Sequence, residues 1–174
     1  MNYWHDIDSG SVDELNVLIE IPKGSKNKYE IDKETGLIAL DRVYHTSQDC
    51  PFDYGFVPQT LWDDGDALDV VLLTTNPLYP GILVKSRPVG IMRMTDSGES
   101  DDKVIAVPVS DPRWNHVQDI GDVNQHTIKE ITHFFTTMKL LQNKITTVDK
   151  FEGKDKVAEA LAHAQKLYKE KFAK

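Results

Sequence analysis

The stretch Leu15-Asn16-Val17-Leu18-Ile19-Glu20-Ile21 (residues 15–21) indicates how this chain folds. Every second residue from Leu15 to Ile21 is a large aliphatic one. A repeat of two residues is typical of a β-strand, in which successive side chains point to opposite faces. The segment therefore predicts a strand with two distinct faces, one of them apolar and the other carrying the carboxylate of Glu20.

Similar short segments follow along the first two-thirds of the chain. Residues 28–32 alternate in the same way, and a turn at Lys33-Glu34-Thr35-Gly36 precedes a third predicted strand, Leu37 to Tyr44. Short apolar runs separated by proline and glycine continue after it, at 70–73, 82–85, 89–94 and 104–109. This pattern predicts a sheet built from many short strands.

The last third of the chain changes to a helical repeat. Apolar residues between Val123 and Leu141 fall on one helical stripe, and a second stripe runs from about Lys154 to Phe172. The second stripe includes Tyr168, whose ring we expect to be buried with its hydroxyl group hydrogen-bonded. Strands followed by terminal helices indicate the α+β class, as a small antiparallel barrel flanked by two helices toward the C-terminus. We expect residues 1–174 to form one domain.

The composition excludes several classes of protein. With 28 acidic and 20 basic residues, the chain has a formal net charge of -8, which disfavours nucleic-acid binding. The same charge repels a free polyanion unless cations accompany it. The single cysteine, Cys50, excludes an internal disulfide framework and favours a reducing compartment. Residues 1–6 do not resemble a secretory signal, and no apolar run has membrane-spanning length, so we expect a cytoplasmic protein without a membrane partner.

The densest chemical feature is Asp63-Asp64-Gly65-Asp66-Ala67-Leu68-Asp69, with four carboxylates in seven residues. These charges repel one another unless a counter-ion binds, and Mg²⁺ prefers oxygen ligands such as carboxylates, waters and phosphates. A second acidic stretch lies between two predicted strands, at Asp96, Glu99, Asp101 and Asp102. Two acidic clusters suit a site with several metals, which can hold both the attacking and the leaving oxygen of a phosphoryl displacement.

The acidic run alone leaves two interpretations open. Acidic loops are commonly solvated turns, and Asp-Gly is a common turn dipeptide. An EF-hand is excluded, because placing Gly65 at position six of its loop puts Val71 at position twelve, where that loop needs glutamate. The spacing by itself supports a metal site and a solvated turn equally.

Basic residues add to the case for an anion site. Arg42 shares its predicted strand face with Ile38 and Leu40, and a desolvated arginine needs an anionic partner. That partner is either a neighbouring aspartate or a phosphate group that matches the planar guanidinium. Lys28, Lys103 and Lys139 are further candidates, with surface charge as the alternative for the last two.

Several segments occur together in a characteristic order: Ile19-Glu20-Ile21-Pro22, Lys28-Tyr29-Glu30-Ile31-Asp32-Lys33, Asp41-Arg42, Asp53-Tyr54-Gly55-Phe56-Val57-Pro58, Asp64-Gly65-Asp66-Ala67-Leu68-Asp69, Arg87-Pro88-Val89-Gly90, Met94-Thr95-Asp96, Asp101-Asp102-Lys103, Ala106-Val107-Pro108 and His133-Phe134-Phe135. With them the chain resembles, along nearly its whole length, the family I soluble inorganic pyrophosphatases of prokaryotic type. The element at 64–69 is highly specific in that setting.

The resemblance implies a five-stranded OB-like barrel with a catalytic cavity at its mouth. It implies hydrolysis of inorganic pyrophosphate, bound as its magnesium complex, to two orthophosphates. Several Mg²⁺ ions per site are expected, with Mn²⁺ or Zn²⁺ as possible substitutes. The resemblance also implies a homo-oligomer, a hexamer.

The resemblance further implies a role for individual residues. Asp64, Asp69 and Asp101 hold the first magnesium, and Asp69 bridges to the second. Asp66 acts as the general base toward the attacking water. The sites of further metals are lined by Glu20, Glu30 and Asp96, and phosphate oxygens are contacted by Lys28, Arg42, Tyr54, Lys103 and Lys139.

The chain departs from the family's pattern at two positions. Cys50-Pro51 stands where the family usually has tyrosine-proline, and Met138 stands where a tyrosine usually precedes the lysine at 139. We expect the loss of each hydroxyl group to weaken phosphate binding by about 0.5–1.5 kcal/mol. Cys50 is interpreted as a small buried hydrophobe, with an accessible thiol near the cavity as the alternative.

Two other functions are weighed against pyrophosphate hydrolysis. A metal-dependent nucleotide phosphohydrolase also uses clustered aspartates, but the chain has no G-x-x-x-x-G-K-[ST] loop and no evident base-stacking platform. A non-catalytic OB-like module for single-stranded nucleic acid is disfavoured by the net negative charge.

Overall fold

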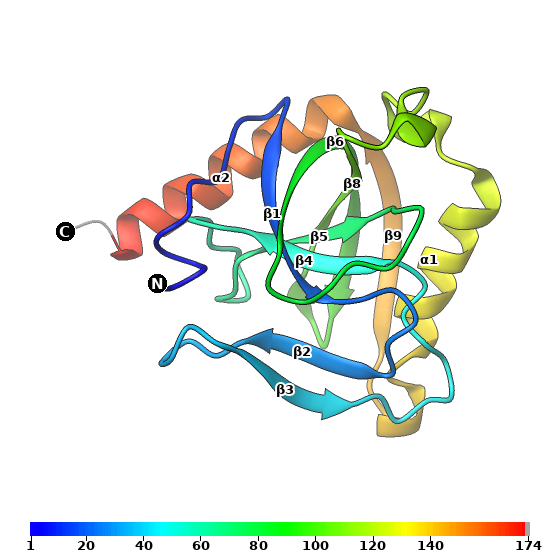
Figure 1. Cartoon of the computed structure of the whole chain (residues 1–174). Helices are drawn as coiled ribbons and strands as arrows, with labels where there is room; N and C mark the ends of the chain where they lie inside the picture. Colours follow the sequence, from blue (N-terminus) through cyan, green and yellow to red (C-terminus); the bar gives the residue numbers. More distant parts are fainter. Residues whose placement is uncertain (173–174) are drawn as a thin grey trace.

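The computed structural model describes residues 1–172 and shows a ring of strands with two helices beside it (Figure 1). The ring contains, in spatial order, β1 (Leu15–Ile21), β4 (Asp53–Val57), β5 (Leu68–Leu72), β8 (Lys103–Pro108) and β6 (Leu83–Asp96). β6 pairs again with β1, which closes the ring. The five-stranded barrel implied by the resemblance is thus present.

One strand pairing differs from the expected antiparallel arrangement. The β5–β8 pair is parallel, whereas the other four pairs of the ring are antiparallel. The reason is geometric: in a closed ring with an odd number of strands, direction cannot alternate at every step. At least one neighbouring pair must therefore be parallel.

β6 joins two segments that the sequence pattern separates. The predicted strands at 82–85 and 89–94 form one continuous strand, with Pro88 next to a β-bulge that lies between Pro88 and Gly90. A bulge is one of the few places in a sheet that tolerates proline, so Pro88 does not end the strand. β6 also pairs with β7 (Glu99–Ser100) and β9 (Thr146–Gly153). β4 and β9 are strands that the sequence pattern does not predict.

A separate hairpin lies beside the barrel. It consists of β2 (Asn27–Ile31) and β3 (Ile38–Val43), which pair only with each other. The Ile31 N–H donates to the Glu20 carboxylate at 2.8 Å, which ties the hairpin to β1. The hairpin surface is open to solvent, since Leu40 is 57% exposed. The strand face of Arg42 is therefore not a buried apolar one, contrary to the premise drawn from its sequence neighbours.

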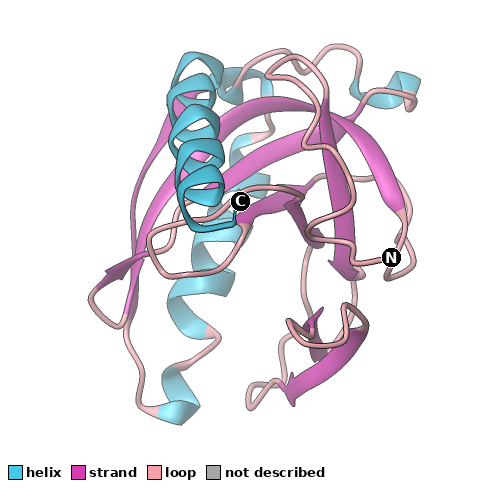
Figure 2. Ribbon diagram, turned by 90° about the vertical axis from the view of Figure 1, so that its left-hand side faces the viewer, coloured by secondary structure: helices cyan, strands magenta, loops and turns pink. Residues whose placement is uncertain are grey.

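Two helices cover the barrel, and Figure 2 shows the longer one lying across the strands. α1 (Gln125–Thr137) buries Ile131, Phe134 and Phe135, and α2 (Lys154–Phe172) buries Val157, Ala160, Leu161 and Ala164. The stripe predicted to reach Leu141 ends earlier, and a short 3-10 turn, η3 (Leu140–Gln142), follows with Leu140 and Leu141 exposed. The connection before α1 contains two further turns, η1 (Pro112–Trp114) and η2 (Ile120–Asp122).

The hydrogen bond predicted for the Tyr168 hydroxyl group is confirmed, whereas its ring is only partly buried. Its hydroxyl group lies 2.7 Å from His5 Nδ1, and its ring packs beside Trp4 and Phe172. Nowhere in residues 1–172 is there a helix with the length and apolar character that crossing a bilayer requires.

Candidate active site

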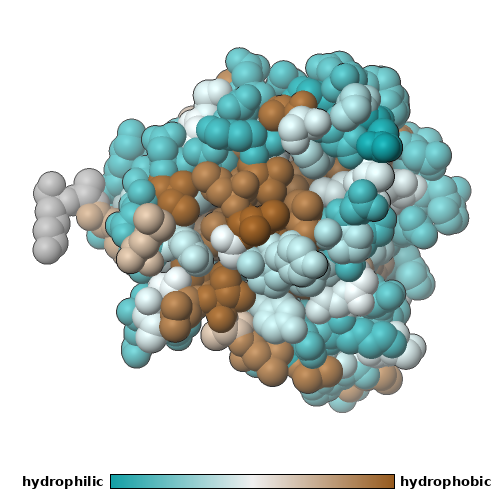
Figure 3. Space-filling view, in the orientation of Figure 1, coloured by the Kyte–Doolittle hydropathy of each residue, from teal (hydrophilic) through white to brown (hydrophobic). Residues whose placement is uncertain are grey.

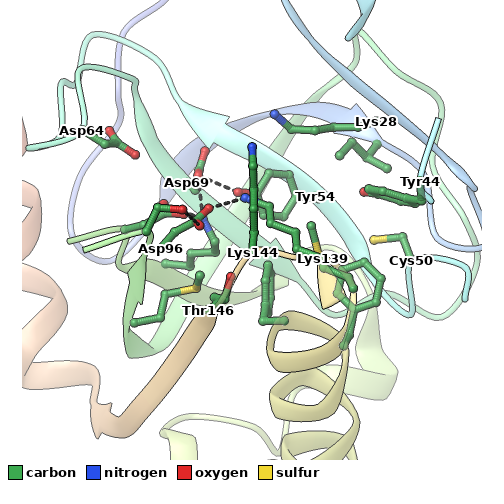
Figure 4. A pocket seen from close by; sticks show the side chains of 18 of the residues that line it. Lys28, Tyr44, Cys50, Tyr54, Asp64, Asp69, Asp96, Lys139, Lys144 and Thr146 are labelled. Atoms are coloured by element: carbon green, nitrogen blue, oxygen red, sulfur yellow. Dashed lines mark hydrogen bonds and ion pairs between the residues drawn. The ribbon is translucent and has the colours of Figure 1, made fainter. Parts of the chain in front are cut away.

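A cavity of about 320 Å³ opens between the barrel, the β2–β3 hairpin and the end of α1 (Figure 4). Most of the site residues expected from the sequence line it: Lys28, Arg42, Tyr54, Asp64, Asp66, Asp69, Asp96, Asp101, Lys103 and Lys139. The remaining two, Glu20 and Glu30, line an adjoining cavity that shares Lys28, Tyr54, Asp66 and Asp69 with the first. Residues far apart in the chain thus meet in one place.

The centre of the acidic side is Asp69 on β5. The register of the sheet places it opposite Lys103 of β8, and its neighbours Leu68 and Val70 are fully buried. Asp69 Oδ2 accepts hydrogen bonds from Tyr54 Oη at 2.5 Å and from Lys103 Nζ at 2.9 Å. The barrel core therefore holds Asp69 firmly at the cavity.

A tight turn presents two further aspartates of the run, Asp64 and Asp66, to the cavity. Gly65 has a φ of +89°, a conformation that glycine adopts at little cost. The Asp66 backbone N–H donates to Asp64 Oδ1 at 3.0 Å, which orients the Asp64 carboxylate. The Asp66 side chain is 58% exposed and pairs with Lys33 Nζ at 2.5 Å. Asp66 is thus the solvent-facing carboxylate of the group.

Burial and mutual repulsion raise the pKa values of several carboxyl groups in this region. The pKa of Asp64 rises to about 6 because of burial and the charges of Asp69 and Asp101, although the Asp66 N–H opposes the change. Burial raises the pKa of Asp101 as well, against the effect of Lys103. Burial, together with Asp69, raises the pKa of Glu20 to about 8. These carboxyl groups are buried and lie close to one another, which is an environment that a bound cation stabilises.

Lys103 differs from the other candidate lysines. Its side chain is only 2% exposed, and its Nζ also donates to Asp101 Oδ1 at 2.7 Å. Burial alone would lower its pKa, but the charges of Asp69 and Asp101 outweigh it and raise the pKa. Lys103 therefore lies between the two aspartates as a buried counter-ion.

The basic side of the cavity lies on the hairpin and after α1. Lys28 Nζ pairs with Glu30 at 2.9 Å and with Asp41 at 3.1 Å, and Arg42 lies 3.7 Å from the same Asp41. The neighbouring aspartate considered as the partner of Arg42 is therefore present, while Arg42 still faces the cavity. Lys139 pairs with Asp96. Burial would raise the pKa of Asp96, but the hydrogen bond and charge of Lys139 outweigh it and lower the pKa.

The donor chemistry of the acidic side fits a hard divalent cation. Asp64, Asp69, Asp96 and Asp101 present only oxygen ligands there, as magnesium prefers. Among the described residues, no group of three or more His, Cys, Asp or Glu side chains is gathered closely enough to hold a metal ion. Lysine ammonium groups lie among these carboxylates instead, at Lys103 and Lys139. A cation of higher charge is compatible with the same oxygens if these lysine contacts rearrange.

Cys50 and Met138 both lie at the apolar end of the cavity. Cys50 is 1% exposed, its Sγ donates to the Phe52 carbonyl at 3.2 Å, and burial raises its pKa to about 12. The interpretation of Cys50 as a small buried hydrophobe is therefore confirmed. Met138 caps the C-terminal end of α1.

Sequence reasoning missed three residues of the site. Lys33 pairs with Asp66, Asp41 pairs with Lys28, and Tyr44 lines the cavity wall. Tyr44 was detectable, because it follows Arg42 by two residues in the predicted strand, and residues at that spacing share a face. Nothing in the sequence indicates that Lys33, beyond a turn, reaches Asp66.

Known proteins resemble this chain in both sequence and structure. The sequence model of the family described as inorganic pyrophosphatase matches residues 17–169. The inorganic pyrophosphatase of Haloferax volcanii is 45% identical over 177 residues, covering 99% of each chain. The soluble inorganic pyrophosphatase 1 of Arabidopsis thaliana is 43% identical, covering 96% of this chain and 80% of that protein.

A solved structure agrees with these relatives. The inorganic pyrophosphatase of Thermus thermophilus superposes with a TM-score of 0.93 and 41% identity, covering 97% of this chain and 99% of that one. Because the match extends over almost the whole chain in sequence and in fold, this chain belongs to the inorganic pyrophosphatase family.

Proposed function

We propose that this protein hydrolyses inorganic pyrophosphate to two orthophosphates and that it requires Mg²⁺. One observation carries the proposal: a single cavity has carboxylates on one side and cationic side chains on the other. Such a cavity suits a small polyanion that arrives with its own cations. A substrate bound as its magnesium complex also avoids repulsion by a chain with a net charge of -8.

The roles proposed for the carboxylates are those that the resemblance implies for these positions. Asp64, Asp69 and Asp101 would hold the first magnesium, with Asp69 shared with a second ion. Asp96, Glu20 and Glu30 would serve further ions that come with the substrate. Several Mg²⁺ ions would then occupy the site, and Mn²⁺ or Zn²⁺, which also accept carboxylate ligands, would substitute.

The bound cations would lower the pKa of a water molecule and polarise the phosphate oxygens. Asp66 then accepts the proton of that water as the general base, a role that its exposed carboxylate permits. Asp66 must first leave Lys33, which is an exposed pair and so costs little to separate.

The basic side binds and orients the two phosphates. Lys28, Arg42 and Lys139 reach the cavity from the hairpin and the end of α1, where they would neutralise charge on the leaving phosphate. The Tyr54 hydroxyl, which donates to Asp69, positions that carboxylate, and it would contact a phosphate oxygen by exchanging this hydrogen bond for one to the substrate. Lys103 contributes through the two aspartates that it holds.

We further propose a cytoplasmic homo-oligomer, a hexamer, in which residues 1–174 form one domain. Figure 3 shows apolar side chains gathered over the region where β1 lies beside β6. Ile82 and Leu83 are 37% and 46% exposed there. An exposed apolar patch is typical of a protein–protein interface, which supports self-association.

One assay tests the proposed function. Orthophosphate release is measured from pyrophosphate over a titration with Mg²⁺, beside ATP and a labelled oligonucleotide. We expect release from pyrophosphate only, with no activity in a chelator. Stable pyrophosphate together with cleaved ATP would favour a nucleotide phosphohydrolase, and oligonucleotide binding without cleavage would favour a binding module.

A further inference from the structure

The apolar end of the cavity contains a tyrosine that the proposed reaction does not use. Tyr44 follows β3 directly, and its N–H donates to the Lys26 carbonyl at 2.9 Å. The N–H of Cys50 donates to the carbonyl of the adjacent Ser25 at 2.8 Å. The backbones of Tyr44 and Cys50 are thus bonded to the carbonyls of two consecutive residues, Lys26 and Ser25. Their side chains therefore begin at neighbouring points of the cavity wall. Figure 4 shows them side by side, with the hydroxyl and the sulfur directed toward the cavity.

The ring of Tyr44 is buried but its hydroxyl group is not enclosed. The ring packs edge-on against Phe134 with 5.8 Å between centroids, and the residue is 8% exposed. Within residues 1–172, no group forms a hydrogen bond with the Tyr44 hydroxyl. The enclosed side-chain atoms without a partner in this part of the chain are Asn16 Oδ1, Trp62 Nε1 and Thr146 Oγ1. The Tyr44 hydroxyl therefore has open space beside it and a donor hydrogen to offer.

The surroundings of this hydroxyl favour an anionic oxygen as its partner. Arg42 lies two residues earlier on the same strand and lines the same cavity, as does Lys28. Burial and the nearby Cys50 raise the pKa of Tyr44, so its phenol keeps the proton at neutral pH. A neutral donor between cationic side chains adds a hydrogen bond to a phosphate without adding charge.

We propose that the Tyr44 hydroxyl donates a hydrogen bond to a phosphate oxygen of the bound substrate and so replaces the tyrosine hydroxyl expected at position 50. This inference rests on the proposed function. The small side chain of Cys50 leaves room beside the Tyr44 phenol, so that a large and a small residue share this part of the cavity wall. The cavity then lacks one tyrosine hydroxyl, at Met138, rather than two.

The Tyr44→Phe variant tests the inference, because it removes only the hydroxyl group. We expect the Kd for inorganic phosphate with Mg²⁺, and the KM for pyrophosphate, to rise about 2- to 12-fold. The thermal midpoint should not change, since the hydroxyl has no protein partner. Tyr79→Phe is the matched control, because Tyr79 is 81% exposed and does not line the cavity, and it should bind phosphate as the wild type does.

The outcomes separate this inference from the proposed function. Wild-type phosphate affinity in Tyr44→Phe, in a protein that hydrolyses pyrophosphate, would overturn the inference. Weakened phosphate binding in Tyr44→Phe, in a wild type that leaves pyrophosphate intact, would support the inference and overturn the proposed function.

A residue exchange tests whether positions 44 and 50 serve the same oxygen. Tyr44→Leu should weaken phosphate binding, and adding Cys50→Tyr to it should restore affinity to within about 2-fold of wild type. Cys50→Tyr alone should lower the thermal midpoint, because two phenols crowd one space. A double variant that binds phosphate no better than Tyr44→Leu would overturn the equivalence of the two hydroxyl groups.

Discussion

The two sides of the cavity are built on elements that differ in how deeply they are buried. The acidic wall (Asp64, Asp66, Asp69 and Asp101) lies on and beside β5 and β8, whose neighbouring residues Leu68, Val70 and Val104 are fully buried. The basic wall (Lys28, Arg42, Tyr44 and Lys139) lies on the β2–β3 hairpin and after α1, where Leu40 and Leu140 are exposed. Barrel packing therefore constrains Asp69 and Asp101 more than it constrains Lys28 and Arg42 on the hairpin.

This contrast bears on the two positions where the sequence differs from the pattern expected by resemblance. Metal ligands require fixed geometry, and the expected carboxylates are all present. Hydrogen bonds to phosphate are available from several directions, so a hydroxyl group can be supplied from a different residue. Both departures, Cys50 and Met138, accordingly lie at the end of the cavity next to the basic wall.

The largest effect is expected from the base on the acidic wall. Asp66→Asn removes the proton acceptor, and kcat for pyrophosphate should fall about 10²- to 10⁴-fold. Asp63→Asn is the control, because Asp63 is exposed and pairs with His163 outside the cavity. Steady-state phosphate release measures both. Wild-type turnover in Asp66→Asn would remove Asp66 from the mechanism.

Removing the buried counter-ion should come next in size. Lys103→Met leaves Asp69 and Asp101 close together without compensation, and the free energy of unfolding in chelator should fall by about 3–5 kcal/mol. Adding Mg²⁺ should recover part of this loss. Urea denaturation provides the measurement, with the exposed Lys150→Met as control. An unchanged unfolding free energy would show that the two aspartates need no buried cation.

A smaller effect is expected on the basic wall. Arg42→Gln removes a charged donor that can form two parallel hydrogen bonds. The KM for pyrophosphate should therefore rise roughly 10- to 100-fold, which corresponds to a loss of about 1.5–3 kcal/mol of binding free energy. The kcat should change less than the KM if Arg42 binds both ground state and transition state. Arg113→Gln is the control and should behave as the wild type. The Arg113 side chain is 71% exposed and lies outside the cavity. An unaltered KM in Arg42→Gln would assign Arg42 only to its pair with Asp41.

The smallest effect concerns the thiol of Cys50. Its folded-state pKa, about 12, lies above the usual value of 9.0, so little thiolate exists at pH 8 and alkylation of the native protein should be slow. For the same reason, Cys50 stabilises the fold below pH 9 and this contribution is lost as the pH rises toward 12. Mass spectrometry after iodoacetamide treatment, with and without urea, measures the labelling. Rapid labelling of the native protein would contradict the enclosed position of Cys50.

Local patterns predicted much of the fold because they report local preference. The apolar stripe of α2 gave the same bounds, Lys154–Phe172, as the structure. The alternation of β2 and β3 also placed both strands to within about two residues. β4 and β9 escaped prediction because their identity as strands depends on pairing with distant partners, β1 and β6.

The sequence by itself determined the chemistry available to this protein: clustered carboxylates at 64–69, a second acidic stretch, and the basic residues at 28, 42 and 139. Only the tertiary structure decided how these groups pair. Lys103 became the buried partner of two aspartates, Asp66 met Lys33, and Tyr44 came to lie beside Cys50. The reason is physical: residue type and repeat are local properties, whereas burial and ionic pairing depend on strands that meet only when the barrel closes.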